Sequence, residues 1–222
     1  MKEYLRQTVK LRLDGSSSIN DTYSSDVGLD ALDLAAKKAK SISFSTLGPD
    51  GTSSHLCANF VIREILGGRG DCYLFPTYEE AGADVCDGLA DFLLVANAYQ
   101  FINKFYISAE YDTVHFFAYD TPPYGLASST GKIPKKDGAV IISTHPAPAH
   151  LIAKLYPNNG TSYETIFSNS TRAAAMQVSE NISDICLTNT VAMRNEYLKP
   201  CSDTIVIKMP WTIFKRRSLH SV

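Results

Sequence analysis

The sequence lacks the features that direct a protein to nucleic acid or to a membrane. Its 222 residues carry 21 Lys and Arg against 23 Asp and Glu, a net charge of −2 at pH 7. With no basic excess and no clustered basic patch, binding to nucleic acid or to an anionic membrane is not expected. No apolar run is long enough to span a bilayer, and residues 1–6 are charged rather than apolar. We therefore expect a cytoplasmic protein.

Cysteine and histidine are sparse and lack the spacing of a metal site. The five cysteines are an odd number without a C-x-x-C pair, and the five histidines contain no H-E-x-x-H motif. We expect reduced thiols and no bound metal. The residues are Cys57, Cys72, Cys86, Cys186 and Cys201, with His55, His115, His145, His150 and His220.

What is present fits an α/β protein. Hydrophobic residues make up 45% of the chain, enough for one globular unit or two small lobes. Strand patterns alternate with helical ones along the chain, which favours parallel sheets. The predicted strands cover 42–47, 73–75, 91–96, 114–119, 140–142, 184–189 and 203–209, and the predicted helices begin near residues 52, 78, 146 and 171.

The pattern also divides the chain. Turn and linker composition marks residues 1–40 as an appendage, and Pro122, Pro123 and Gly125 indicate a crossing between two lobes. We expect lobe 1 to comprise 41–120 and 196–222, and lobe 2 to comprise 121–195. Two crossings would form a cleft between the lobes.

Three predicted helices begin with hydroxyl residues. The first is Thr52-Ser53-Ser54 after a glycine turn that includes Gly51, the second is Ser143-Thr144-His145-Pro146, and the third is Asn169-Ser170-Thr171. Free backbone N–H groups and the helix dipole at such a start can hold an anion, and glycine lets a ligand come close. Ordinary capping is the alternative for each one. Their recurrence favours a small molecule with more than one anionic group.

Polar residues also follow two predicted strands. Asn97 and Tyr99 follow the strand at 91–96, and Asn189 ends the strand at 184–189. In open α/β sheets ligands bind beyond the carboxyl ends of strands, so these side chains are candidates to face one. Aromatic packing under a loop is the alternative for Tyr99.

Four motifs, in order, resemble the catalytic domain of the prephenate dehydratases. The resemblance covers residues 41–215 and implies the two-lobed fold of type II periplasmic binding proteins, with the active site in the interlobe cleft. The motifs are Gly48-Pro49-x-Gly51-Thr52-x-Ser54-His55-Leu56, Ser143-Thr144-His145-Pro146, Ser170-Thr171-x-Ala173-Ala174 and Trp211-Thr212-Ile213-Phe214.

Two departures make the chain more similar to the prephenate decarboxylases of secondary metabolism, such as those of the bacilysin, aeruginosin and salinosporamide pathways. Dehydratases have Pro-Ile-Glu-Asn after the strand where this chain has Ala96-Asn97-Ala98, so the acidic side chain is absent. Their terminal Thr-Arg-Phe is here Thr212-Ile213-Phe214. An enzyme that keeps the ring hydroxyl of prephenate must withhold assistance from that leaving group, and both departures fit this requirement.

The resemblance implies a decarboxylase that acts on prephenate without a cofactor, and a homodimer by analogy with the dehydratases. The proton donor is His145, Tyr99, Tyr124 or a water that they hold, although His145 can instead cap its helix start. A true dehydratase, favoured by the retained Thr212, and a non-catalytic small-anion binding protein are the alternatives. The expected site has catalytic residues His145, Tyr99, Tyr124 and Thr212, and substrate-binding residues Gly51, Thr52, Ser53, Ser54, Asn97, Ser170, Thr171 and Asn189.

Overall fold

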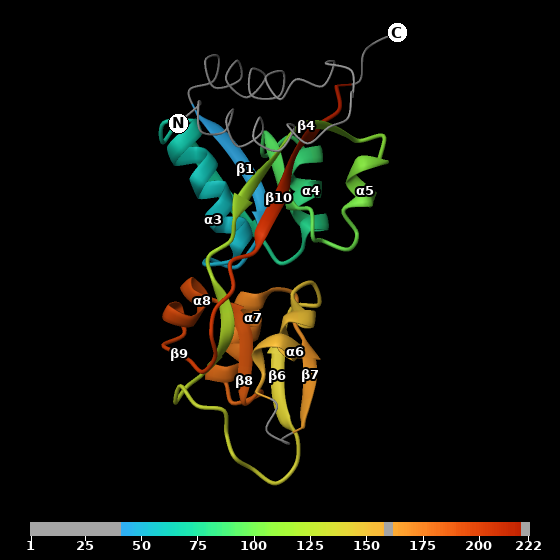
Figure 1. Cartoon of the computed structure of the whole chain (residues 1–222). Coiled ribbons are helices and arrows are strands. Elements are labelled where there is room, and N and C mark those ends of the chain that lie inside the picture. Colours follow the sequence, from blue (N-terminus) through green and yellow to red (C-terminus); the bar gives the residue numbers. More distant parts are fainter. Residues whose placement is uncertain (1–40, 158–161, 219–222) are drawn as a thin grey trace, which may run out of the picture. The chain divides into compact units, whose positions relative to one another are not determined.

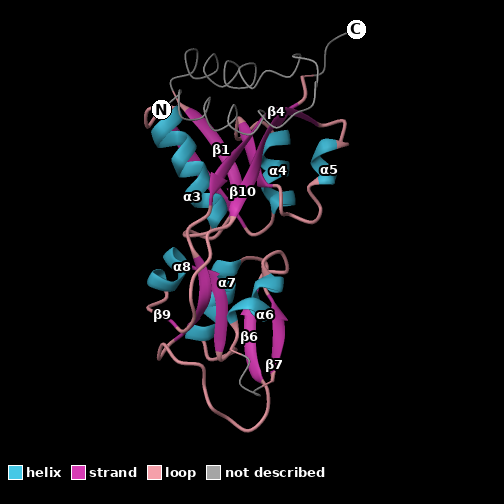
Figure 2. Ribbon diagram, in the orientation of Figure 1, coloured by secondary structure: helices cyan, strands magenta, loops and turns pink. Residues whose placement is uncertain are grey.

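The computed structural model describes residues 41–157 and 162–218, which form two α/β units (Figure 1). Within the described residues, unit 1 contains 41–46, 57–119 and 209–218, and unit 2 contains 47–56 and 120–208. Each unit has its own five-stranded sheet with helices against it (Figure 2). The predicted two-lobed α/β class is therefore confirmed. The predicted appendage at 1–40 lies outside the described residues.

The sheet of unit 1 has the strand order β2-β1-β3-β10-β4. Strand β1 runs parallel to β3, whereas β10 is antiparallel to β3 and sets Thr212 opposite Val95. Trp211 of β10 donates its indole N–H to the carbonyl of Tyr119 in β4 at 3.0 Å. The strands are β1 (Ile42–Leu47), β2 (Gly70–Phe75), β3 (Phe92–Ala96), β4 (Tyr111–Asp120) and β10 (Lys208–Arg216).

Apolar side chains of α3 (Ser53–Phe60) and of the following π-helical turn, Val61–Ile65, share a core with this sheet. Their helical spacing in the sequence gives one apolar stripe, and burial of that stripe is the main driving force for the packing. The buried core includes Phe44, Val61, Leu94, Trp211 and Ile213. Two further helices of the unit are α4 (Tyr78–Cys86), capped by Thr77, and α5 (Asn103–Tyr106).

The sheet of unit 2 has the order β7-β6-β8-β5-β9. Strands β7, β6 and β8 are parallel, and β5 is antiparallel to both β8 and β9. The carboxyl ends of the three parallel strands therefore share one edge with the amino end of β5, where Tyr124 pairs with Asn189. The strands are β5 (Tyr124–Ser128), β6 (Val140–Thr144), β7 (Tyr163–Phe167), β8 (Ile185–Asn189) and β9 (Lys199–Pro200).

Helix α7 (Thr171–Ser179) packs on β6 and β8 (Figure 1). Its buried Ala174 and Ala175 have small side chains, which let the helix approach the sheet closely. The remaining helical segments of the unit are a 3₁₀ turn, Ala149–Leu151, followed by α6 (Ile152–Leu155), and α8 (Thr190–Asn195).

The strand predicted at 203–209 is wrong for most of its length. Ile205 makes a single bridge to Tyr124, with both N–H···O distances at 2.7 Å, and regular pairing begins only at Lys208. Residues 196–208 were expected in lobe 1, but they belong to unit 2. The reason is local pairing, because β9 extends the sheet at β5 and Cys201 donates its N–H to the carbonyl of Leu126 at 2.8 Å.

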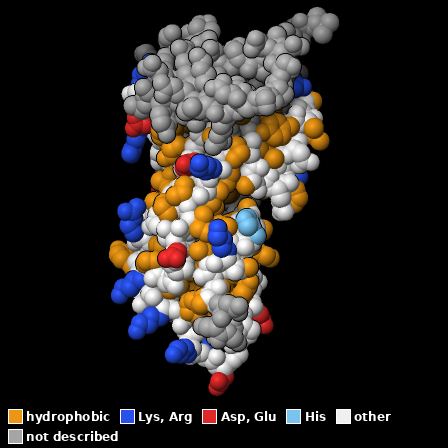
Figure 3. Space-filling view, in the orientation of Figure 1, with side chains coloured by type: hydrophobic (Ala, Val, Ile, Leu, Met, Phe, Trp, Pro, Cys, Tyr) orange, Lys and Arg blue, Asp and Glu red, His pale blue; other side chains and the backbone are white. Residues whose placement is uncertain are grey.

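The surface carries dispersed charge on the face shown in Figure 3. Lys and Arg side chains stand singly there among polar and apolar ones. Among the described residues no helix has both the length and the apolar character needed to cross a membrane.

Candidate functional site

The first predicted cap is confirmed. Thr52 precedes α3, and its hydroxyl accepts the N–H of His55 at 3.2 Å while it donates to the carbonyl of Leu47 at 2.8 Å. Gly51, just before it, has φ +82°, a conformation that an L side chain rarely adopts. Ser54, in the first turn of α3, is buried. The predicted turn and helix start are thus fixed by this threonine and this glycine.

The third predicted cap is also confirmed. Ser170 is the N-cap of α7, and its hydroxyl accepts the N–H of Ala173 at 3.0 Å. The carbonyl of Thr171 accepts the hydroxyl of Thr188 in β8 at 2.7 Å, so the first turn of the helix is tied to the sheet. Ser170 and Thr171 are both buried.

The second predicted cap is wrong. Ser143 and Thr144 belong to β6, and their hydroxyls donate to the carbonyls of Ala174 at 2.8 Å and Leu187 at 3.1 Å. No side chain caps the 3₁₀ turn that follows. Buried hydroxyls must find an acceptor, and these two find it in neighbouring elements of unit 2 rather than at a helix start.

His145 directly follows β6, and its ring is turned back on its own chain. Its Nδ1 accepts the N–H of Ala147 at 3.2 Å, so the imidazole is neutral and any ring proton lies on Nε2. Burial lowers its pKa below the ordinary value. The contact is local and lies in the turn before the 3₁₀ segment, so His145 does not cap the helix start.

Three hydroxyl groups of unit 2 form a chain. The phenol of Tyr124 lies 2.8 Å from the hydroxyl of Ser53 and 3.3 Å from that of Thr171. Three hydroxyl protons serve these two contacts, so one proton remains for another acceptor. The chain joins the start of α3, the start of β5 and the start of α7, which are distant in the sequence.

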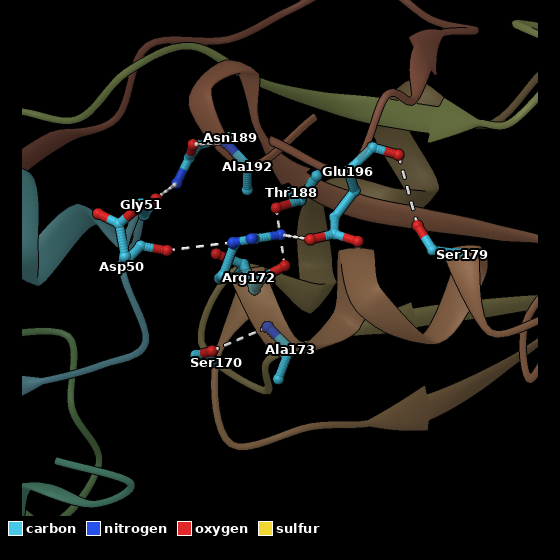
Figure 4. Close-up of polar contacts among 11 residues, drawn as sticks. Asp50, Gly51, Ser170, Arg172, Ala173, Ser179, Thr188, Asn189, Ala192 and Glu196 are labelled. Atoms are coloured by element: carbon cyan, nitrogen blue, oxygen red, sulfur yellow. Dashed lines mark hydrogen bonds and ion pairs between the residues drawn. The ribbon is translucent and has the colours of Figure 1, made fainter. Parts of the chain in front are cut away.

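Asn189 ties the glycine turn to another helix start (Figure 4). It is the N-cap of α8 and is fully buried; its Oδ1 accepts the N–H groups of Val191 at 2.9 Å and Ala192 at 2.8 Å. Its Nδ2 donates to the carbonyl of Gly51 at 3.2 Å. The position of Gly51 therefore depends on an amide that is already fixed by the α8 backbone.

Arg172 is a residue of this region that the sequence analysis missed. Its Nε donates to the carbonyl of Asp50 at 3.1 Å, and its guanidinium pairs with Glu196 (Figure 4). Both side chains of the pair are mostly buried. Arg172 occupies the variable position of the Ser-Thr-x-Ala-Ala motif, and no spacing pattern links it to Glu196, so neither residue could be predicted from the sequence.

Two predicted residues of unit 1 are hydrogen-bonded to each other. The hydroxyl of Thr212, fully buried in β10, donates to Oδ1 of Asn97 at 2.7 Å. The phenol of Tyr106, at the end of α5, lies 2.6 Å from the same hydroxyl. Tyr106 was not predicted, because nothing in its sequence position indicates that it reaches β10.

Tyr99 belongs to a separate group in unit 1. Its phenol donates to both carboxylate oxygens of Glu79, at 2.8 and 2.9 Å, and Lys104 donates to the same carboxylate at 3.1 Å. Partial burial, and then the Glu79 hydrogen bond, raise the pKa of Tyr99. Partial burial acts to raise the pKa of Glu79, but hydrogen bonds from Tyr99 and Lys104 bring it below the ordinary value. The predicted packing is also present, since the rings of Tyr99 and Tyr78 are 4.8 Å apart.

The predicted residues thus fall into separate groups. Unit 2 brings together the glycine turn, three helix starts and Tyr124, and unit 1 brings together Asn97 and Thr212. His145 and Tyr99 have contacts apart from these groups. The unit 2 group consists of Gly51, Thr52, Ser53, Ser54, Tyr124, Ser170, Thr171 and Asn189.

Comparison with known sequences gives close matches over most of the chain, although no family model matches. A protein of Bacillus subtilis named prephenate decarboxylase is 34% identical over 188 residues, which cover 82% of this chain and 90% of the relative. A protein of Planktothrix agardhii with the same name is 32% identical over 186 residues, which cover 82% and 92%.

Comparison with solved structures supports the fold. A prephenate dehydratase of Arthrobacter aurescens, in complex with L-Phe, aligns with a TM-score of 0.59 at 14% identity and covers 80% of this chain and 61% of the other. A periplasmic substrate-binding protein of an ABC transporter from Coxiella burnetii aligns with a TM-score of 0.52 at 12% identity, with 79% and 84% covered. At these identities the likeness concerns the fold.

Proposed function

We propose that this chain, which belongs to the prephenate decarboxylase family, removes the ring carboxylate of prephenate as CO2 and leaves the ring non-aromatic. The observation that carries the proposal is the 32–34% identity to proteins named prephenate decarboxylase, over about four fifths of the chain. The enzyme is accordingly a carboxy-lyase. Its product is a dihydro-4-hydroxyphenylpyruvate, a precursor for secondary-metabolite biosynthesis of the bacilysin or aeruginosin kind.

The chemistry defines what the site must do. The bond between the ring and its carboxylate breaks, and its electron pair enters the ring diene. A proton then adds to a distal ring carbon, while the bond to the ring hydroxyl stays intact. Loss of that hydroxyl would give an aromatic ring, a strongly favourable outcome, so selectivity depends on the absence of help to the leaving hydroxyl.

We assign binding of the side-chain carboxylate to the unit 2 group. Its hydroxyl chain has one proton to spare, and the first turn of α7 adds N–H groups and the positive end of a helix dipole. The mostly buried Arg172 guanidinium adds a cation in the same unit, compensated by Glu196. Fixed donors of this kind position an anion without reorganisation.

Tyr124 is the best supported of the three candidate proton donors. Its phenol lies in a hydroxyl chain through which a lost proton can be replaced from Ser53 or Thr171. In Tyr99 the proton is committed to Glu79, and the raised pKa makes the phenol a weaker acid. The lowered pKa of His145 keeps its imidazole neutral at pH 7, which is unsuited to a general acid.

The direct test follows the stoichiometry of products. Purified protein is incubated with prephenate at pH 8, and released CO2 is compared with phenylpyruvate measured by its alkaline absorbance, with an enzyme-free control. CO2 without phenylpyruvate supports the decarboxylase. Equal amounts of CO2 and phenylpyruvate would identify a dehydratase, the alternative that the retained Thr212 favours. Binding of prephenate without turnover would identify a small-anion binding protein.

A homodimer and a cytoplasmic location stay predictions. Light scattering of the purified protein tests the first of these.

A further inference from the structure

Thr212 has its hydroxyl between two partners on different elements of unit 1. Asn97, which follows β3, accepts the hydroxyl proton through Oδ1 at 2.7 Å, and Tyr106 of α5 lies 2.6 Å from the same oxygen. The N–H of Asn97 donates to the carbonyl of Pro210 at 3.0 Å, and this bond ties its backbone to β10. The ring of Tyr106 rests edge-on against Phe214 of β10, with centroids 5.1 Å apart. Both partners are thus positioned by β10 itself.

The direction of these bonds follows from proton counting. A hydroxyl has a single proton, and Thr212 gives it to Asn97. The contact at 2.6 Å then requires the phenol of Tyr106 to donate to the threonine oxygen. Thr212 is fully buried, and hydrogen bonds between buried groups are costly to break. Its hydroxyl therefore has no proton left for a ligand.

We propose that Asn97 and Tyr106 are specificity-determining positioning residues: Asn97 holds the hydroxyl proton of Thr212, and Tyr106, by donating to the threonine oxygen, keeps that hydroxyl turned toward Asn97, so the proton is denied to the ring hydroxyl of prephenate. The inference rests on the proposed function. Aromatisation breaks the bond between the ring and its oxygen, and that oxygen leaves as water only if it receives a proton. With Thr212 committed, the electron pair released with CO2 is quenched by a proton at ring carbon, and the hydroxyl is retained.

The test removes the acceptor. In Asn97→Ala the proton of Thr212 is released, and we expect the phenylpyruvate share of the product to rise about tenfold over the wild-type background, the factor that one ordinary hydrogen bond contributes. Asn97→Asp keeps an acceptor oxygen at the same place and should restore the non-aromatic product. The double variant Asn97→Ala with Thr212→Val should bring phenylpyruvate back to background, because the released proton is gone.

A second variant tests the same inference if Asn97→Ala does not fold. Tyr106→Phe removes only the hydroxyl of a residue that is 43% exposed. The Thr212 hydroxyl is then free to turn away from Asn97, and the phenylpyruvate share should rise by a smaller factor. Tyr73→Phe, in the same unit and 45% exposed, is the matched control and should leave the product unchanged. Thermal unfolding of each variant reports its fold.

The outcomes separate the two proposals. A wild-type protein that releases no CO2 from prephenate overturns the proposed function, and this inference with it. A wild-type protein that decarboxylates, while folded Asn97→Ala and Tyr106→Phe both remain non-aromatising, overturns this inference alone. A rise in phenylpyruvate that persists in the double variant also overturns this inference alone, because the proton given to the ring hydroxyl would then not come from Thr212.

Discussion

The polar groups of the two units differ in whether a hydroxyl proton is available for a ligand. In unit 2 the hydroxyls of Ser53, Tyr124 and Thr171 share three protons over two contacts, so the chain can still donate. In unit 1 the Thr212 proton is taken by Asn97, and the Tyr99 proton is taken by Glu79. One unit is suited to give hydrogen bonds to an anion, and the other is suited to withhold them. The proposed decarboxylation needs hydrogen-bond donors for the carboxylates and none for the ring hydroxyl.

The largest loss of activity is expected from a substitution at Gly51 of unit 2. In Gly51→Ala the residue would keep φ +82°, and the new Cβ would lie 2.7 Å from the side-chain amide of Asn195. The Asn195 amide can move aside, but the positive φ strains an alanine, and relief of that strain shifts the turn. We expect kcat/KM for prephenate to fall by roughly a hundredfold, since misplacement of about 1 Å has that effect. Steady-state kinetics measures the loss.

Gly68→Ala in unit 1 is the matched control for Gly51→Ala. Gly68 has φ +80°, but a Cβ there meets nothing within 4 Å. Both variants should lose stability through backbone strain, by about 1–2 kcal/mol each, and only Gly51→Ala should lose activity. Equal activity loss in the two variants would mean that strain, not the turn, is responsible.

Removing one hydroxyl of unit 2 tests whether its hydroxyl chain is needed for activity. Tyr124→Phe leaves the ring in place and interrupts the hydroxyl chain between Ser53 and Thr171. We expect kcat/KM to fall about tenfold or more, because a hydrogen bond to a charged group contributes about 1.5–3 kcal/mol. Tyr163→Phe in β7 is the control and should behave as the wild type. A normal Tyr124→Phe enzyme would remove both the binding and the proton-donor roles of this phenol.

The corresponding change in unit 1 should have a smaller effect. Tyr99→Phe removes a phenol whose proton is already committed to Glu79, so we expect kcat to change by less than about threefold. The carboxylate of Glu79 keeps its bond to Lys104. A kcat loss as large as that of Tyr124→Phe would contradict the distinction between the two units.

Each unit also holds a histidine whose pKa burial lowers, His145 in unit 2 and His115 in unit 1. Their folded pKa values lie below about 6.5, so the unfolded chain binds protons more readily between the two values. The free energy of unfolding should therefore fall as pH drops below about 6.5, and should gain nothing from these groups above it. Urea unfolding at pH 5.5 and 7.5 measures the difference, which His145→Asn and His115→Asn should each reduce. An unchanged difference in both variants would contradict this assignment.

Much of the fold could be predicted because periodicity and capping are local signals. The apolar stripe after Thr52 and the cap at Ser170 specified α3 and α7 from short stretches of sequence. The errors arose where long-range pairing decided the outcome. Ser143 and Thr144 resembled a cap but belong to β6, and their acceptors come from α7 and β8.

The candidate site was predictable in part for the same reason. Motif positions made Gly51 and Thr171 candidates and the end of a predicted strand made Asn189 one, whereas Arg172, Glu196, Tyr106 and Glu79 act through partners that are far away in the sequence. The stretch Ala96-Asn97-Ala98 after β3 contains no acidic residue, yet a carboxylate from α4 lies against Tyr99. Only the folded chain brings such pairs together.

Proton NMR of the product shows directly whether the ring of prephenate stays non-aromatic. Wild-type protein is incubated with prephenate at pH 8, and the ring protons are followed with time beside an enzyme-free sample. We expect new olefinic signals from a non-aromatic ring that keeps its hydroxyl, formed together with CO2. Aromatic signals of phenylpyruvate as the main enzymatic product, or prephenate left unchanged, would contradict the proposed function.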